Sequence, residues 1–405
     1  MRLNLLRATV AGVALATAGA AAADTVTLRF WDNQQTESGL SEFQQEAVER
    51  FMAENPNIRV EVTTIPYPEY QQRLLTAVQG GNAPDVATLD QIWVAAFAEA
   101  GAVADLTDMA AEAGLTQDGF FGGAWDSAVY NDRLWGVPFN VDVWQFSFVN
   151  RALFEAAGVD PESIATFEGL RAAAEALTGD GRFGVGLFAH RGEDTVVVSN
   201  SFIFSNGGAV LDEDGMCALN RPEAVEALEY LQDLAQFAPA GILNASSGDM
   251  RELFLNESLA IEFWPALEQP TLQASGLDWD FVNGTAPEGR TPVGTFGGWN
   301  LALFADAPHP EEAWKFIQFM VREDVNGDVV DLIPANMAAA EEFLAENRVG
   351  PDRIMEHLEN AQPRPLSPRY LEVSDIQVRM MQDIYSGGDA QAAADAACAD
   401  IDALR

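Results

Sequence analysis

The stretch TVTLRFWDNQQTESGLSEFQQEAVERFMAENPNIRVEVTTI (Thr25–Ile65) decides the fold class. Its beginning, TVTLRFW, alternates between polar and apolar residues, which is typical of a half-buried strand. After a polar stretch, apolar residues from Phe43 to Met52 recur at helical spacing until Asn55-Pro56 ends the helix. The run Asn57–Ile65 alternates again, so this stretch predicts a strand, a helix and a second strand.

The alternation of strands and helices continues along the chain. Residues 68–84 carry a second helical pattern with a glycine stop, DVATLD (Asp85–Asp90) is a short strand, and residues 92–106 are again helical. Strands that alternate with helices at this spacing predict a mostly parallel sheet. Ligands bind beyond the carboxyl ends of such strands, so we expect a site where these three strands end. These ends are Trp31–Asp32, Ile65–Tyr67 and Asp90–Trp93.

The first residues have the features of a secretory signal peptide. Arg2 and Arg7 precede a short apolar run, and Ala21 and Ala23 flank a cleavage point, so we expect residues 1–23 to be removed after export. The apolar run is too short to span a membrane. We therefore expect the mature chain to begin near Asp24 and to be a soluble protein of the periplasm.

The chain is strongly acidic. It has 22 basic and 62 acidic residues and a formal net charge of −40, and Lys315 is its only lysine. Nucleic acids and anionic membranes bind basic patches, so we expect neither of them as a partner. The acidic residues are spread along the chain, which indicates a solvated surface, and the length of 405 residues favours two domains.

Motifs for metals, cofactors and common enzymes are missing from the sequence. The three histidines are far apart, and neither a P-loop lysine nor a GxSxG elbow occurs, so we expect no cofactor and no metal site. Cys217 and Cys398 are the only cysteines, and they allow one disulfide in an oxidising compartment. Two cysteines alone do not show that they meet, so a bridge and two separate thiols both stay open.

The chain has nine tryptophans. The apolar face of a sugar ring packs flat on an indole, while its hydroxyl groups need carboxylate, amide and guanidinium partners. Five tryptophans lie at strand or loop ends, namely Trp31, Trp93, Trp144, Trp264 and Trp299. The polar residues that suit a sugar at such a site are Asp32, Gln34, Asp90, Asn140, Asp142 and Arg364.

The segment TFGGWNLALF (Thr295–Phe304) has the apolar character of a buried strand, yet it contains Gly297 and Gly298 directly before Trp299. Glycines inside a strand mark a place where another group comes close to the backbone. Two explanations stay open. The glycines let the backbone approach a sugar that rests on Trp299, or they only allow the strand to pack closely against a helix.

The order of motifs along the chain resembles the extracellular solute-binding proteins of family 1, which serve ABC importers and include maltose- and trehalose-binding proteins. The most specific part is AWDSAVYNDRLWGVPFNVDVWQFSFVNRALFEAAGVD (Ala124–Asp160). The segments GGWNLALF, PEEAWKFIQFM and PRPLSPRY then follow in the order that is typical of this family. The resemblance covers nearly all of the mature chain.

The resemblance implies a periplasmic binding protein fold of the type II kind, in which two discontinuous α/β lobes are joined by a hinge. One lobe would take residues 24–140 and 288–334, and the other residues 141–287 and 335–405. Members of the family capture a sugar between the lobes, close around it and present it to a membrane permease.

The resemblance also implies roles for single residues. Trp299 matches the sugar-stacking tryptophan after two glycines, and Asp142 matches an acidic partner of the ligand. Arg364 resembles an arginine that reaches the ligand in some members, whereas Trp264 departs from the pattern because it precedes a proline. The predicted ligand-binding residues are Trp31, Asp32, Gln34, Asp90, Trp93, Asp142, Trp144, Trp264, Gly298, Trp299 and Arg364, with no catalytic residue among them.

We therefore expect a monomeric periplasmic binding protein that captures a sugar and delivers it to an ABC permease without catalysis. The sugar is a mono-, di- or oligosaccharide or a sugar alcohol. Two alternatives stay open. In the first, the same fold binds a non-sugar solute such as a polyamine or a phosphate ester. In the second, the chain is an exported hydrolase or lyase that acts on glycans with a pair of carboxylates.

Overall fold

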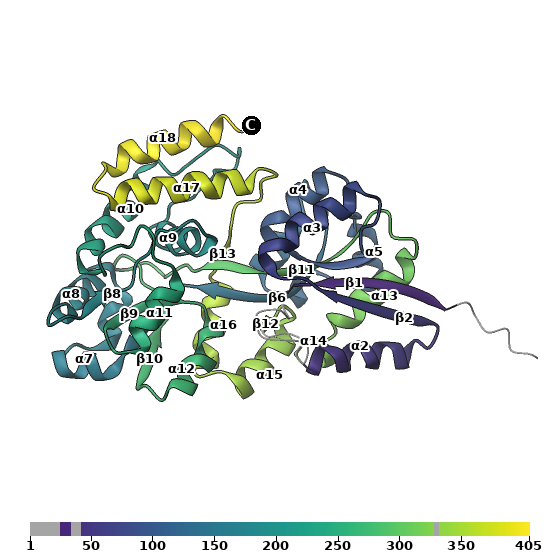
Figure 1. The fold of residues 1–405 in the computed structure, drawn as a ribbon, viewed down its shortest axis with the longest axis horizontal. Helices are drawn as coiled ribbons and strands as arrows, with labels where there is room; N and C mark the ends of the chain where they lie inside the picture. Colours follow the sequence, from purple (N-terminus) through teal and green to yellow (C-terminus); the bar gives the residue numbers. More distant parts are fainter. Residues whose placement is uncertain (1–24, 34–41, 328–331) are drawn as a thin grey trace, which may run out of the picture.

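The computed structural model describes residues 25–33, 42–327 and 332–405, and these residues form two lobes that lie side by side (Figure 1). Each lobe is built around its own sheet. The large sheet has the strand order β12-β6-β11-β3-β1-β2, with β13 paired to β11, and the small sheet has the order β10-β7-β9-β8. We call them the first and the second lobe. The predicted α/β class and the two-lobe architecture are confirmed.

The large sheet begins with the alternation that the sequence predicts. β1 runs parallel to β2 and β3, whereas β11 runs antiparallel to β3 and β6. The last predicted helix is shorter than expected, because α4 (Val94–Glu99) ends before Gly101, which has a φ of +64°. The strands are β1 (Val26–Asp32), β2 (Ile58–Thr64), β3 (Val86–Asp90), β6 (Val137–Trp144), β11 (Thr295–Leu303), β12 (Ile333–Pro334) and β13 (Gln362–Pro363).

Helices cover both faces of the large sheet. α3 (Tyr67–Gln79) and α4 pack on one face, while α2 (Glu42–Glu54) and α13 (Pro310–Met320) pack on the other. On the α2 face, the ring of Phe316 makes edge contacts with Phe30 and Phe51 at centroid distances of 5.2 and 5.1 Å, and all three rings are fully buried. This contact brings β1 and α2 together with a helix that lies far later in the chain.

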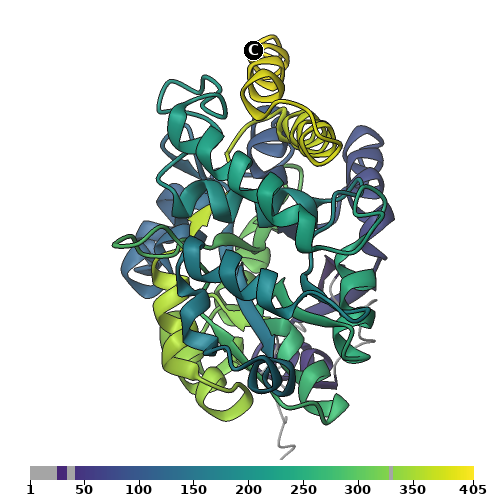
Figure 2. The same ribbon diagram turned by 90° about the vertical axis from the view of Figure 1, so that its left-hand side faces the viewer.

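The second lobe combines the middle of the chain with its carboxyl end. The Asn150 side chain accepts the backbone N–H of Leu153 and starts α7, which ends at Gly158 with a φ of +68°. Figure 2 looks onto this lobe and shows α17 and α18 as a pair at its top. The strands are β7 (Phe146–Asn150), β8 (Phe183–Val185), β9 (Leu259–Trp264) and β10 (Trp279–Val282). The helices are α7 (Arg151–Ala157), α8 (Phe167–Leu177), α9 (Glu193–Ser205), α10 (Pro222–Leu234), α11 (Ser247–Leu255), α12 (Gln269–Ser275), α17 (Tyr370–Tyr385) and α18 (Ala390–Asp402).

Shorter elements connect these layers. A two-stranded ribbon pairs β4 with β5, and three helices lie between β11 and β13 after α13. The elements are α5 (Thr107–Ala113), α6 (Gly122–Ala128), β4 (Val129–Tyr130), β5 (Arg133–Leu134), α14 (Glu323–Asn326), α15 (Met337–Asn347) and α16 (Pro351–Glu359).

The chain first passes from the large to the small sheet at Gln145, between β6 and β7. Gln145 is fully buried and has a φ of +79°, a conformation that non-glycine residues rarely adopt. The His357 ring of α16 packs here against Phe146, at a centroid distance of 4.8 Å. Burial lowers the pKa of His357 to about 4, although hydrogen bonds to the backbone of Trp144 and Gln145 oppose this shift, so the imidazole at the crossing is neutral at pH 7.

A disulfide joins Cys217 to Cys398, so the sequence's open question is settled in favour of one bridge. Cys217 pairs with Leu211 across a small hairpin, and Cys398 lies on the buried face of α18. The carboxylate of Asp402 also accepts the backbone N–H of Cys217 at 2.9 Å. The hairpin is thereby tied twice to the last helix of the chain.

We predict that reduction of this disulfide destabilises the protein. The bridge spans a sequence separation of 181 residues, and a native disulfide of this kind contributes about 2–4 kcal/mol, mainly because it restricts the unfolded chain. Urea denaturation with and without a reductant measures the change in the free energy of unfolding. The variant with both Cys217→Ser and Cys398→Ser is the control, since the reductant should leave it unchanged. Equal unfolding midpoints for the oxidised and reduced wild type would contradict the prediction.

Glu262 is a carboxyl group inside the core of the second lobe. It lies in β9 and is fully buried, and neither of its oxygens has a hydrogen-bond partner. Gly186 makes room for it, because a Cβ at that position would lie 1.6 Å from Oε2 of Glu262. Burial raises the pKa of Glu262 well above its ordinary value, so this carboxyl group holds its proton more tightly in the folded than in the unfolded protein.

We predict that Glu262→Gln gains stability relative to the wild type as the pH rises. The raised pKa means that Glu262 stabilises the fold most below its unfolded pKa of about 4.3 and loses this contribution as the pH rises toward its folded pKa. The difference in unfolding free energy between variant and wild type should grow by at most about 1.4 kcal/mol per pH unit. Urea denaturation between pH 5 and 8 measures it, with the exposed Glu252→Gln as the control. A difference that stays constant over this range would refute the assignment.

Candidate ligand-binding site

Four aromatic side chains meet where the parallel strands of the large sheet end. Tyr67 stacks on Trp93 at a centroid distance of 5.8 Å, and Trp299 meets these rings edge-on at 5.7 and 5.8 Å. Tyr70 packs beneath them, 6.3 Å from Trp299. We call Tyr67, Tyr70, Trp93 and Trp299 the aromatic cluster. Trp93 is buried, whereas Tyr67 and Trp299 are half-buried.

The carboxylates of the last residues of β1 and β3 flank this cluster. Asp90 accepts hydrogen bonds from the Tyr67 hydroxyl and from the backbone N–H of Ile92, both at 3.3 Å. Asp32 is fully buried and accepts the Thr88 hydroxyl at 3.2 Å. Burial raises the pKa of Asp90, and the charge of Arg364 opposes this shift. As predicted from the strand ends, both carboxylates therefore lie at the same edge of the sheet.

Arg364 connects this edge to the second lobe. It follows β13 and is only 8% exposed. Its Nη2 donates to Oδ1 of Asp90 at 3.3 Å, and its Nη1 donates to Oε2 of Glu193 in α9 at 3.0 Å. Glu193 also accepts hydrogen bonds from the hydroxyls of Tyr370, at 2.8 Å, and Ser374. One buried arginine thus holds a carboxylate from each lobe.

Trp299 lies at the centre of the arrangement because β11 runs between β3 and β6. It stands opposite Asp90 on one side and Asn140 on the other. The neighbouring Gly298 has a φ of +149°, and a Cβ there would lie 2.2 Å from the carbonyl oxygen of Asn140. The close approach that the sequence indicated is therefore made by the adjacent strand, and neither a helix nor a ligand is needed to explain this glycine.

Asn140 is the most conspicuous unpaired polar group beside Trp299. It is 1% exposed, yet neither its amide nitrogen nor its amide oxygen has a hydrogen-bond partner. Trp93 contributes another buried donor without a partner, its indole N–H. Such groups are costly to bury when they bond to nothing, so they suit a ligand that carries hydroxyl groups.

The structure brings together six of the predicted residues and leaves others apart. Trp31 is half-buried and packs against the same apolar core as the aromatic cluster, and the Tyr70 hydroxyl donates to its carbonyl oxygen at 2.8 Å. The other members of this group are Asp32, Asp90, Trp93, Trp299 and Arg364, of which Asp32 is linked through Thr88. Gln34 lies outside the described residues.

Three other predicted residues make contacts within the protein rather than at the candidate site. Trp264 is fully buried between the rings of Phe148 and Phe254, so its faces belong to the core of the second lobe. Asp142 is 4% exposed and accepts the backbone N–H groups of Ala266 and Leu267 across the lobe boundary. Burial raises its pKa to about 6, although these hydrogen bonds lower it. Trp144 is half-buried at the end of β6, opposite Thr295.

Several residues of the site were not in the predicted ligand-binding set. Tyr67 lies within a strand end that the sequence had indicated, and Asn140 was only one of several possible hydrogen-bonding residues. No local sequence pattern indicates that Glu193 and Tyr370 belong to the site. They join it only because α9 and α17 pack beside Arg364 in the folded protein.

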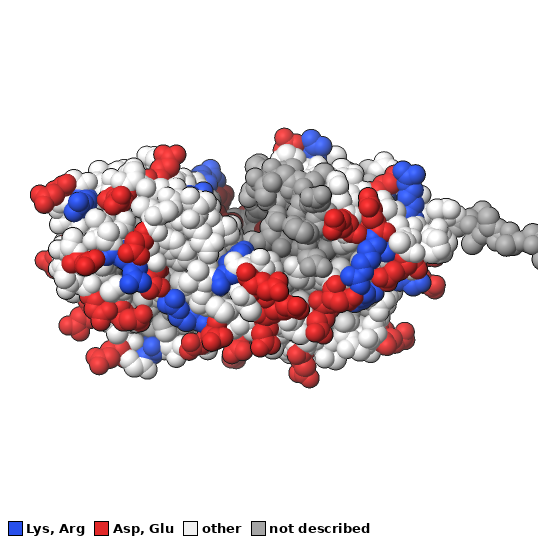
Figure 3. Space-filling view, turned by 90° about the horizontal axis from the view of Figure 1, so that it is seen from below, with Lys and Arg blue, Asp and Glu red and all other residues white. Residues whose placement is uncertain are grey.

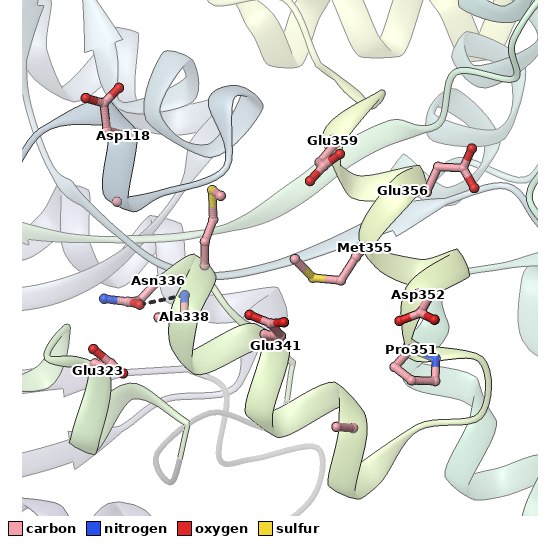
Figure 4. Close-up of a pocket in the computed structure, with 13 residues that line it drawn as sticks. Asp118, Glu323, Asn336, Ala338, Glu341, Pro351, Asp352, Met355, Glu356 and Glu359 are labelled. Atoms are coloured by element: carbon pink, nitrogen blue, oxygen red, sulfur yellow. Dashed lines mark hydrogen bonds between the residues drawn. The ribbon is translucent and has the colours of Figure 1, made fainter.

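A separate cavity of about 890 Å³ lies beside α15 and α16, and none of its described lining residues belongs to the predicted site. Figure 4 shows it between α15 and α16 on one side and the segments of Asp118 and Glu323 on the other. None of its described lining residues is basic, and the acidic ones are Asp118, Glu323, Glu341, Asp352, Glu356 and Glu359. Figure 3 shows that acidic side chains also outnumber basic ones over the face of the molecule seen from below. This cavity is a poor place for an anion.

Other kinds of site find no support in the part of the chain that the structure describes. Within residues 25–33, 42–327 and 332–405, no group of three or more His, Cys, Asp or Glu side chains is arranged to hold a metal ion. Among these same residues, no helix combines the length and the apolar character that a membrane crossing requires.

Comparisons with known proteins agree with this architecture. A solute-binding protein of Thermotoga lettingae bound to α-D-tagatose superposes with a TM-score of 0.79 at 25% identity, and the match covers 94% of this chain and 100% of the other. Maltose-bound MalE3 of T. maritima has a TM-score of 0.77 at 24% identity, with 94% and 100% covered, and supports the fold.

Curated relatives and a family model extend the comparison. A putative binding protein of Brucella abortus is 25% identical over 375 residues, which are 89% of each chain. The sn-glycerol-3-phosphate-binding periplasmic protein UgpB of Escherichia coli is 27% identical over 242 residues, covering 56% of this chain and 54% of UgpB. The model of the bacterial extracellular solute-binding proteins matches residues 33–327. The chain therefore belongs to the bacterial extracellular solute-binding protein family.

Proposed function

We propose that this protein is the periplasmic sugar-binding component of an ABC importer. The observation that carries the proposal is the aromatic cluster with Asp90 at the ends of the parallel strands, where the half-buried residues Trp299 and Tyr67 lie beside carboxylates and the unpaired amide of Asn140. A pyranose or polyol combines an apolar face with a rim of hydroxyl groups, and this combination matches the site.

Several relatives support a sugar-like ligand. Solved proteins of similar fold include complexes with tagatose, maltose and ribitol. We infer a sugar or a sugar alcohol from the site itself, and these relatives make the inference consistent with the family. The formal net charge of −40 disfavours nucleic acid, so the proposed partners are one small solute and the permease subunits of the importer, with the binding protein acting as a monomer.

We further propose that the two lobes close on the solute by a hinge at the strand crossings, with Gln145 as the first of them. Residues 24–140 with 288–334 and residues 141–287 with 335–405 are the proposed lobes. The boundary at residue 140 moves a few residues later, because β6 continues to Trp144 before the chain enters β7. The proposed function involves capture and release of an unchanged solute, so no group has to act in catalysis.

A phosphate ester is the second candidate ligand. The similarity to UgpB, which is named for sn-glycerol-3-phosphate, is the observation that favours it. Phosphate recognition usually relies on arginine, lysine or a helix amino terminus. At this site Arg364 is already paired with two carboxylates, so we prefer the uncharged sugar.

We predict that a neutral sugar or polyol raises the melting temperature and changes the tryptophan fluorescence of the mature protein. Binding to the folded state stabilises it by mass action, by about 2.7 kcal/mol at a ligand concentration of 100 times Kd. A panel of mono-, di- and oligosaccharides, polyols and sn-glycerol-3-phosphate tests the proposal, and the bound sugar should be recovered unchanged after incubation. If no compound of the panel changes the melting temperature or the fluorescence, the sugar-binding function is refuted.

We predict that Trp299→Ala weakens binding of the identified sugar by about tenfold or more, because ring stacking contributes about 0.5–1.5 kcal/mol beyond the apolar area that is buried. Trp299→Phe retains a ring and should lose less. Trp125→Phe in α6 is the matched control, since Trp125 packs against Phe120 away from the aromatic cluster. Calorimetry measures the affinities, and a loss below about twofold for Trp299→Ala would exclude the stacking role.

We also predict that the saturating sugar makes the protein more compact, because hinge closure brings two packed lobes together. Small-angle X-ray scattering with and without the sugar measures the radius of gyration. Identical scattering profiles for the free and the saturated protein would speak against closure while leaving sugar binding intact.

A further inference from the structure

Positive charge is scarce at the candidate site. The segments at the strand ends, Trp31–Asn33, Ile65–Tyr67, Asp90–Trp93 and Gly297–Trp299, contain no lysine or arginine. Among the described residues, Arg364 is the arginine that bonds to Asp90 at this edge of the sheet, and it comes from the segment after β13.

The charge of Arg364 is compensated twice. Asp90 of the first lobe holds its Nη2 at 3.3 Å, and Glu193 of the second lobe holds its Nη1 at 3.0 Å. One cation and two carboxylates give the group a net charge of −1. Glu193 is fixed in this position, because its oxygens also accept the hydroxyls of Tyr370 and Ser374.

The amino terminus of α9 offers no alternative for an anion. A helix amino terminus carries a partial positive charge that attracts negative groups. In α9 the first turn already holds two negative groups of its own, Glu193 and Asp194. An anionic ligand at this edge would therefore meet carboxylates and no uncompensated cation.

We propose that Glu193 is a specificity-determining residue, which neutralises Arg364 from the second lobe and makes the site select uncharged sugars and polyols over phosphorylated or carboxylated ones. The proposal rests on the proposed sugar-binding function and adds the charge class of the ligand. The physical reason is desolvation. An anion that enters the site gives up its hydration and gains no free cation in return, and an unpaired buried charge is strongly unfavourable.

The experiment compares each neutral sugar that binds with its charged counterpart on the mature wild-type protein. The pairs are glucose and glucuronate, maltose and maltobionate, lactose and lactobionate, and glycerol and sn-glycerol-3-phosphate, measured by calorimetry at fixed ionic strength. We expect the anion to bind at least about 100-fold more weakly than its neutral partner. This comparison needs no variant, so it does not depend on whether a substitution folds.

A matched pair of variants then tests the role of Glu193. Glu193→Gln removes one negative charge from Arg364 and should raise the ratio of the affinity for the anion to the affinity for the neutral sugar by about tenfold. Asp375→Asn removes the same charge from the same region, but Asp375 pairs with the exposed Arg191. This control should leave the ratio of the two affinities unchanged, and a thermal melt verifies that both variants fold.

Each outcome supports or overturns a defined statement. A wild type that binds the anion as tightly as the neutral sugar overturns the charge selectivity and leaves the solute-binding function standing. A wild type that selects the neutral sugar, combined with an unchanged ratio in Glu193→Gln, overturns the role of Glu193. If no sugar of either charge binds, the proposed sugar-binding function itself fails, and the inference fails with it.

Discussion

The antiparallel pairing of β6 with β11 is the constraint on which the rest of the structure depends. The two strands pair from Thr295 opposite Trp144 to Leu301 opposite Val137. Both strands connect to the second lobe. The chain leaves β6 for the second lobe through Gln145, and it returns to β11 after β10. The ladder therefore fixes the point at which the two lobes are joined. It also requires Gly298, because any side chain there would collide with the carbonyl of Asn140.

This same ladder determines what surrounds Trp299. Because β11 lies between β3 and β6, the tryptophan is flanked by Asp90 and Asn140, and the rings of Tyr67 and Trp93 complete its surroundings. The site thus combines rigid aromatic surface from helices and strands of one lobe with polar groups that are already held in place. Such preorganised sites lose little conformational entropy when a ligand binds.

Arg364 adds a direct link between the lobes. A buried cation with carboxylates on both sides contributes less to stability than its distances suggest, because all three groups lose their hydration. Arg364 is important because of where it holds the two carboxylates. The guanidinium holds Asp90 and Glu193 in one arrangement, so the electrostatic character of the candidate site is set by residues from both lobes and from the last third of the chain.

The sequence predicted the order of strands and helices well, because periodicity and turn residues act locally. β1, α2, β2, α3 and β3 lie where the alternation predicts them, and the resemblance gave the family through motifs that appear in order. It also predicted that Trp31, Asp32, Asp90 and Trp93 lie at strand ends, since parallel strands place their carboxyl ends on one edge. Trp264 could not be judged in this way. A tryptophan at the end of a strand faces either the solvent or the core, and only the packing of Phe148 and Phe254 decides between them.

By itself, then, the sequence determined the fold class, the family and the edge of the sheet at which a ligand is expected. The tertiary structure decided which side chains share that edge. Glu193 and Arg364 are 171 positions apart, and Cys217 and Cys398 are 181 positions apart. The physical reason is that backbone propensity and side-chain periodicity reach only a few residues along the chain. A buried ion pair, a disulfide or a strand neighbour depends instead on how distant segments pack, and that is fixed only when both lobes are folded.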